Sequence, residues 1–176
     1  MTVYVSDQAH SEVAFQVKHM MVSKVRGGFE NFHFEIETED LETFKDASLY
    51  AEIQTESINT KNTSRDEHLR SEDFFNAEKN PKITFQSKSI SKSGETISAT
   101  GDVTMNGVTK EKTIELEYNG KAMDPWGNEV HGIQSEFVIN REEFGLTWNQ
   151  KLETGGVMVG KEVKAMVELE FTEKTE

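Results

Sequence analysis

The chain has 176 residues, of which 35% are hydrophobic and 29% are charged, a length and balance typical of one water-soluble globular domain. Its 32 acidic and 19 basic side chains give a formal net charge of −13, a field that repels nucleic acid and anionic lipid headgroups, and no run of Lys or Arg supplies a local basic patch. Cysteine is absent, which excludes disulfide frameworks, cysteine nucleophiles and Cys-rich zinc sites.

The N-terminal residues MTVYVSDQAH contain no basic stretch followed by an apolar one, and no apolar run approaches the ~18 residues that span a bilayer. We therefore expect no integral membrane segment and a cytoplasmic protein, or a periplasmic or secreted one if a leader has been removed. No linker, repeat or low-complexity segment divides the chain, so we expect one domain over residues 1–176.

Apolar residues recur at every second position along most of the chain, which is the period of a half-buried β-strand. The alternation predicts strands, in chain order, at residues 11–19, 25–37, 48–57, 82–90, 96–105, 113–119, 132–140 and 163–171. Within the second of these segments the inward parity changes between Phe29 and Phe32, which predicts a β-bulge at Glu30-Asn31, beside Gly27-Gly28.

About eight antiparallel strands with one apolar and one charged face predict an all-β sandwich or closed barrel. The inward faces mix large aromatic residues with small ones, among them Ala51, Ala99, Gly101, Ser135 and Ala165. A barrel of about eight strands is either filled by its side chains or left open for one small ligand. The mixture favours an open interior, and the alternative is a solid core in which small residues lie opposite large ones.

The stretch TSRDEHLRSEDFF, between the third and fourth predicted strands, has the features of a short helix. Ser64 and Glu67 form a capping box, which predicts a helix that starts at Arg65. Asp66 and Arg70 are then four residues apart, and we expect them to pair on an exposed face. The helix should lie near residues 65–75 and end before Pro81.

Leu69, Phe74 and Phe75 in the same stretch are expected to attach this helix to the barrel. Its carboxylates and His68 would diverge on a solvated surface, whereas general acid–base catalysis needs groups that converge on a substrate. We therefore do not assign catalysis to this segment.

The five histidines are scattered and show none of the short spacings of metal sites. There is also no nucleophile-elbow, Walker or dinucleotide-binding motif. We expect no catalytic residue, no metal site and no cofactor. His19 continues the inward parity of its strand, so it either meets the polar end of a ligand or is a hydrogen-bonded residue of the rim. Arg26 either binds an anionic group or forms a surface ion pair.

Several ordered blocks resemble the YceI-like, polyisoprenoid-binding family over nearly the whole chain. These blocks are DQAHSEVAFQVKHMMVSKVRGGF, TKNTSRDEHLRSEDFF followed by NPKITFQS, GDVTMNGVTK and INREEFGL. The resemblance implies a lipocalin-like, extended antiparallel β-barrel with an elongated apolar channel for a long isoprenoid or similar lipid-like chain. This implication agrees with the small inward residues.

We therefore expect a protein that binds, sequesters or transports a long isoprenoid or lipid-like molecule and is not an enzyme. The expected wall residues of the channel are Phe15, Val17, Met20, Met21, Phe29, Phe85, Met105, Phe137 and Phe171. The expected polar residues of its mouth are His19, Arg26, Arg65 and His68.

Two other classes of function stay open. A pocket with His19 or His68 could hydrolyse a lipid headgroup, or a filled barrel could act as a ligand-free stress or interaction protein through its acidic surface. We expect no nucleic-acid partner, and a contact through a strand edge or the rim is compatible with a homodimer.

Overall fold

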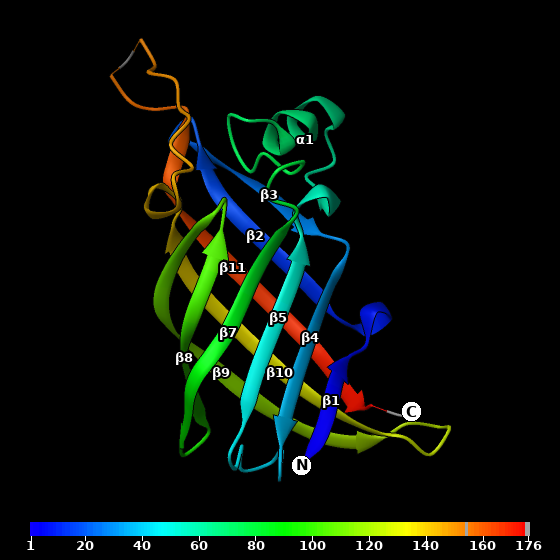
Figure 1. Cartoon of the computed structure of the whole chain (residues 1–176). Coiled ribbons are helices and arrows are strands. Elements are labelled where there is room, and N and C mark those ends of the chain that lie inside the picture. The colour runs from blue at the N-terminus through cyan, green and yellow to red at the C-terminus, as the bar shows by residue number, and fades with distance from the viewer. Residues whose placement is uncertain (154, 175–176) are drawn as a thin grey trace.

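The structure, a computed structural model, describes residues 1–153 and 155–174 and consists mainly of antiparallel β-strands (Figure 1). Within the described residues there is one α-helix, α1 (Thr63–Arg70). The strands are β1 (Thr2–Ser6), β2 (Glu12–His19), β3 (Ser23–Phe29), β4 (Phe32–Thr38), β5 (Ser48–Gln54), β6 (Ile58–Asn59), β7 (Lys82–Ser93), β8 (Thr96–Met105), β9 (Val108–Met123), β10 (Glu129–Asn140) and β11 (Val159–Glu173).

Eight of the described strands close into a barrel, in the order β1-β4-β5-β7-β8-β9-β10-β11 and back to β1. Strand β11 has two partners on one side: Phe171 and the two residues after it pair with β1, whereas residues 159–168 pair with β2. Strands β3 and β6 continue the wall from β2. The expected all-β barrel of about eight strands is therefore confirmed.

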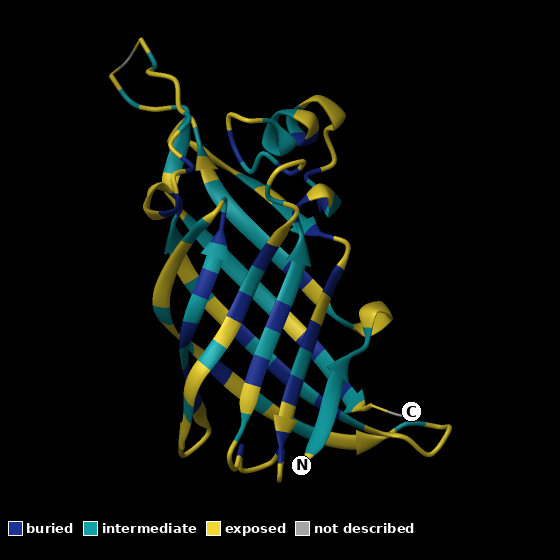
Figure 2. Cartoon of the chain, in the orientation of Figure 1, coloured by how far each residue is buried: buried dark blue, intermediate teal, exposed yellow. Residues whose placement is uncertain are grey.

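The end of the barrel that carries α1 is called the upper end here, and both termini lie toward the lower end (Figure 1). Buried and exposed residues alternate along the strands, as the banding in Figure 2 shows. In β8 every second residue from Ile97 to Met105 is buried, which is the inward set that the alternation predicts. The apolar faces of the strands thus meet inside the barrel.

Two details of the strand prediction are corrected. Strand β1 was not expected, and it closes the barrel between β4 and β11. The segment 25–37 is not one bulged strand: β3 ends at Phe29 and β4 begins at Phe32. The two strands have different neighbours, because β3 pairs with β2 and β6 while β4 pairs with β1 and β5. The parity change therefore marks a corner between strands.

The helix begins two residues earlier than expected and has a different cap. The side-chain oxygen of Asn62 accepts a hydrogen bond of 3.0 Å from the backbone N–H of Arg65, so Asn62 and not Ser64 is the N-cap. Ser64 instead lies within the first turn of α1, so it is not at the N-cap position.

The expected exposed pair of Asp66 and Arg70 is also wrong. Asp66 is buried and accepts hydrogen bonds from the backbone N–H and the hydroxyl of Thr60. Arg70 donates to the backbone carbonyl oxygens of Glu56 and Ile58. Both side chains therefore attach α1 to the segment that precedes it, and they do not form an ion pair with each other.

We expect Asn62→Ala to lower the free energy of unfolding by about 1 kcal/mol, because the N–H of Arg65 loses its acceptor. Ser64→Ala is the matched control and should change the free energy of unfolding by less than about 0.5 kcal/mol. Urea unfolding of the two variants measures the difference. A larger loss for Ser64→Ala than for Asn62→Ala would restore the capping box.

Candidate functional site

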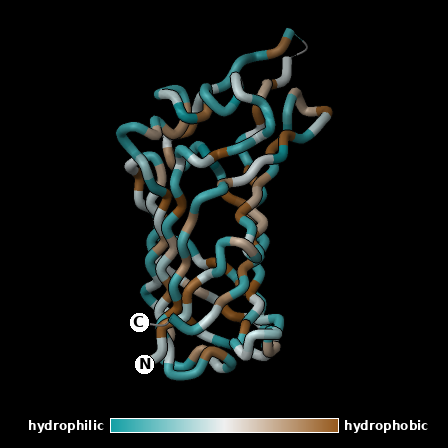
Figure 3. Tube along the Cα trace, turned by 90° about the vertical axis from the view of Figure 1, so that its right-hand side faces the viewer, coloured by the Kyte–Doolittle hydropathy of each residue, from teal (hydrophilic) through white to brown (hydrophobic). Residues whose placement is uncertain are grey.

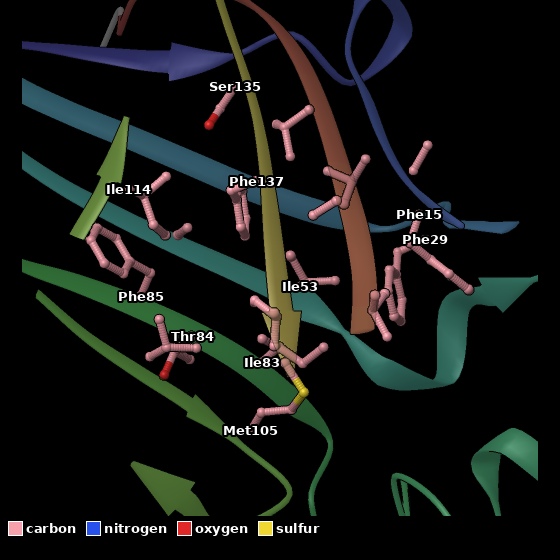
Figure 4. A pocket seen from close by; sticks show the side chains of 18 of the residues that line it. Phe15, Phe29, Ile53, Ile83, Thr84, Phe85, Met105, Ile114, Ser135 and Phe137 are labelled. Carbon is pink, nitrogen blue, oxygen red and sulfur yellow. The ribbon is translucent and has the colours of Figure 1, made fainter. Parts of the chain in front are cut away.

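A cavity of about 230 Å3 lies inside the barrel and is lined by 34 residues, mostly apolar (Figure 4). Its walls come from residues of β2, β3, β4, β5, β6, β7, β8, β9, β10 and β11. Leu69, Phe74 and Phe75, from α1 and the segment after it, line the cavity at the upper end. The expectation that these three residues attach the helix to the barrel is confirmed.

The incomplete burial of several lining residues shows that the interior is open. Val163, Ala165 and Val167 point inward from β11, line the cavity and are nevertheless only half-buried. Nearer the lower end, Ile97 and Phe171 are 0% exposed, so there the side chains fill the barrel. The structure thus combines a packed lower end with an open apolar chamber above it.

Seven of the nine expected wall residues line the cavity: Phe15, Val17, Phe29, Phe85, Met105, Phe137 and Phe171. Met20 and Met21 do not belong to this lining, and they are 43% and 63% exposed at the tip of the β2–β3 hairpin. Strand β2 ends at His19, so the alternation that directs residues inward stops before them. Figure 4 shows Phe15 and Phe29 close together beside the cavity, with ring centroids 5.7 Å apart.

The expected polar mouth residues are not brought together around the cavity. His19 is half-buried at the end of β2, opposite Ser23 and Val159, and is not part of the lining. Arg26 is exposed on the outer face of β3, because its neighbours Val25 and Gly27 occupy the inward positions.

Arg65 and His68 make contacts within the upper end. Arg65 donates from Nε to the hydroxyl of Thr60 at 2.8 Å, and from a terminal nitrogen to the carbonyl oxygen of the same residue at 2.7 Å. His68 forms a 2.8 Å hydrogen bond with Asp73 and contacts the rings of Phe74 and Trp148 edge-on. The contact with Trp148 joins α1 to the loop that follows β10.

Arg141 is the polar residue of this region that sequence reasoning missed. It lines the cavity, is 4% exposed, and donates four hydrogen bonds to backbone carbonyl oxygens, at positions 146, 148, 159 and 160. Burial lowers the pKa of its guanidinium, although nearby Glu142 opposes the shift. The available signal was the basic residue within INREEFGL, one of the blocks that resemble the YceI-like family.

A polar cluster lies inside the packed lower end. His131 is 3% exposed, and its Nδ1 forms a 2.8 Å hydrogen bond with the hydroxyl of Tyr118. Its Nε2 lies 3.0 Å from a carboxylate oxygen of Glu129, but outside hydrogen-bond geometry. Tyr4 contacts the imidazole edge-on, and burial raises the pKa of both tyrosines. These residues lie outside the lining of the cavity.

Among the described residues, one group has donor atoms close enough for a metal: Asp7, His10 and Glu170. His10 is exposed and already forms a 2.8 Å hydrogen bond with Asp7, which accounts for the grouping without a metal. No helix in the described part of the chain is long and apolar enough to cross a bilayer.

A family model described as the YceI-like domain matches residues 4–171. UPF0312 proteins of Staphylococcus aureus strains USA300 and NCTC 8325 are each 46% identical to this chain over 173 residues, which is 98% of the chain and 98% of each relative.

Solved structures give the same match. A Campylobacter jejuni YCEI protein superimposes with a TM-score of 0.75 at 32% identity, over 96% of both chains. BcnA of Burkholderia cenocepacia matches with a TM-score of 0.81 at 21% identity, over 94% of this chain and 98% of its own. A polyisoprenoid-binding domain from Saccharophagus degradans matches with a TM-score of 0.75 at 13% identity, over 99% and 100%. The last two likenesses concern the fold.

Proposed function

The chain belongs to the YceI-like domain family, and from that premise we propose that it binds one long apolar chain, an isoprenoid or a similar lipid, inside the barrel. In this role the protein sequesters or carries the molecule without turning it over. The observation that carries the proposal is the open apolar chamber of about 230 Å3, whose inward-facing residues remain partly uncovered.

The chemistry of the walls favours a hydrocarbon chain. Burial of apolar surface contributes about 25 cal/mol per Å2, or about 0.8 kcal/mol for each methylene. The side chains around an empty apolar cavity also lack van der Waals contacts on the side that faces it. A chain that fills the cavity supplies these contacts. The same fold occurs in a domain described as polyisoprenoid binding, which makes isoprenoids the first chains to test.

The upper end is where the polar end of such a ligand would lie. Arg141 is the charged side chain in the cavity lining, and α1 and the loop after β10 meet nearby through His68 and Trp148. Of the proposed mouth residues, Arg65 and His68 belong to this end, whereas Arg26 faces outward from β3. A headgroup held here would contact few polar groups, so we expect the chain to dominate the affinity.

A binding role agrees with how the candidate histidines are used. His68 is bonded to Asp73 and packed between two aromatic rings, and His19 ends a strand. Neither lines the cavity, so neither has a bound chain's headgroup fixed against it. Turnover of a polyprenyl phosphate that is lost in both His19→Ala and His68→Ala would instead establish the hydrolase alternative.

Delipidated protein titrated with isoprenoid alcohols of increasing length should show affinity that rises at least about tenfold per isoprene unit and then levels off. The rise reflects apolar area buried, and the plateau marks the length at which the cavity is full. Replacing the alcohol by a phosphate at constant chain length should change the affinity much less. Affinity that depends on the headgroup and ignores chain length would contradict the proposal.

A further inference from the structure

The tip of the β2–β3 hairpin exposes three apolar residues in a row. Met20, Met21 and Val22 are 43%, 63% and 88% exposed, and together they are called the hairpin tip. The tip lies beside the loop that precedes β11, since the backbone N–H of Met20 donates to the carbonyl oxygen of Met158 at 2.7 Å. Both loops lie at the upper end of the barrel (Figure 1), and Figure 3 shows both chain termini at the opposite end.

The hairpin tip holds apolar side chains where a turn normally has Asn or Gly. Met20 and Met21 have φ angles of 52° and 64°, in the left-handed region that bulky residues rarely adopt. The N–H of Val22 donates to the carbonyl oxygen of His19 at 3.2 Å, which closes the turn around the two methionines. Neither the folding of the turn nor solubility in water favours these residues. Contact with a partner outside the chain accounts for them better.

Cations gather on the outer face of the strands that hold the tip. Lys18 and Lys24 lie directly opposite each other on β2 and β3, and Arg26 is next but one along β3. Lys161 of β11 lines the same surface groove as the two lysines. These four side chains are called the basic face. Within the described residues none of the four pairs with a carboxylate, although Glu162 also lines the groove.

A like-charge pair such as Lys18 and Lys24 destabilises a sheet, and it stands out in a chain of net charge −13. Exposed carboxylates also lie at the upper end, among them Glu67 of α1 and Glu72 and Asp73 just after it. Strand β10 has 12 residues, so the barrel is roughly 30 Å tall once strand tilt is allowed for. The Debye length at physiological salt is about 8 Å, so charges at the lower end are screened from a surface that touches the upper end.

We propose that the hairpin tip and the basic face dock the protein on an anionic phospholipid bilayer, with the upper end of the barrel against the membrane. The three apolar side chains enter the interface between headgroups and acyl chains, and the four cations contact lipid phosphates. Methionine suits this position because its unbranched side chain adapts to an irregular surface. Docking goes beyond the binding of a chain in the cavity and does not depend on what fills it.

Sedimentation with vesicles tests docking on the full chain, with no isoprenoid present. The protein should bind vesicles that contain 30% phosphatidylglycerol in phosphatidylcholine, and pure phosphatidylcholine much more weakly. Lys18→Gln with Lys24→Gln should weaken binding to the anionic vesicles about 30-fold, since each lysine near such a surface contributes about fivefold. High salt should weaken binding of the parent protein in the same way.

The triple change Met20→Asn, Met21→Gly and Val22→Ser separates docking from folding. Asn and Gly suit the left-handed positions, so this variant should melt at the same temperature or higher while its vesicle binding falls at least about tenfold. Trp126→Ser is the matched control, because Trp126 is 83% exposed in the β9–β10 turn at the lower end, and its vesicle binding should be unchanged.

Equal binding to anionic and neutral vesicles, or undiminished binding by the triple variant, would overturn the inference. So would a parent protein that ignores vesicles but forms a dimer that the triple variant disrupts, because the hairpin tip would then join two copies of the chain. A parent protein that binds vesicles but no isoprenoid would count against the proposed function and leave the docking inference intact.

Discussion

Ala165→Trp is expected to weaken isoprenoid binding at least about 100-fold while the barrel stays folded. Ala165 faces the cavity from β11, and its partners across the neighbouring strands are Phe15 and Phe137. An indole at this position would lie between the two phenylalanines and occupy much of a 230 Å3 chamber. Because the side chain fills empty space, the free energy of unfolding should change by no more than about 1 kcal/mol.

Met166→Trp is the matched control for this change. Met166 is the next residue on β11 and faces outward, opposite Ala14 and Glu136. The same indole on the outer face should leave isoprenoid affinity within about twofold of the parent protein. Fluorescence titration with a long-chain isoprenoid measures both variants. If Ala165→Trp binds as tightly as Met166→Trp, the chain does not lie in the cavity.

Arg141→Met is expected to lower the free energy of unfolding by about 3–5 kcal/mol. The guanidinium is 4% exposed and donates hydrogen bonds of 2.8, 2.6, 3.0 and 3.2 Å to four carbonyl oxygens. Methionine keeps much of the volume but leaves these acceptors without donors in a region closed to water, and each such loss costs about 1–3 kcal/mol before relaxation. Two of the four carbonyls, at positions 146 and 148, lie in the loop between β10 and β11, and the other two lie at the start of β11, so that loop should loosen first.

Urea unfolding measures the loss, and two further variants locate its cause. Arg141→Lys retains the charge without the planar arrangement of donors, so it should fall between the parent protein and Arg141→Met. Arg26→Met is the exposed control and should alter the free energy of unfolding by less than about 0.5 kcal/mol. A cost for Arg141→Met as small as that of Arg26→Met would show that the four hydrogen bonds contribute nothing.

The inward faces were predictable because alternation is a local property of a strand. Phe15 and Val17 face the cavity for the same reason that Gln16 does not. The alternation does not extend past the strand: Met20 and Met21 were expected among the wall residues of the channel, although β2 ends at His19. No Gly or Asn marks that turn, so the usual sequence signal for its position was missing.

Small inward residues were read as one class, and the structure divides them. Ala165 and Ser135 line the cavity, as an open interior requires. Gly101 is small for another reason: a Cβ atom there would lie 2.2 Å from the carbonyl oxygen of Gln86, beside the irregularity of β7. Composition alone cannot separate room for a ligand from room for a neighbouring backbone.

Arg141 and the basic face could not be found from local patterns because fold topology assembles both. The acceptors of Arg141 lie up to 19 residues further along the chain. Lys18 and Lys24 approach across a hairpin, and Lys161 reaches them from β11, so no run of basic residues is visible in the sequence. The absence of a run of Lys or Arg in the sequence therefore does not exclude a cluster of cations that the fold brings together.

Native mass spectrometry of the protein as purified, followed by extraction with organic solvent, tests the central claim most directly. The account predicts a complex of one chain with one long apolar molecule, recovery of that molecule in the extract, and its absence from Ala165→Trp prepared in parallel. A parent protein with the mass of the chain alone, which after delipidation takes up no isoprenoid in titration, would contradict the account.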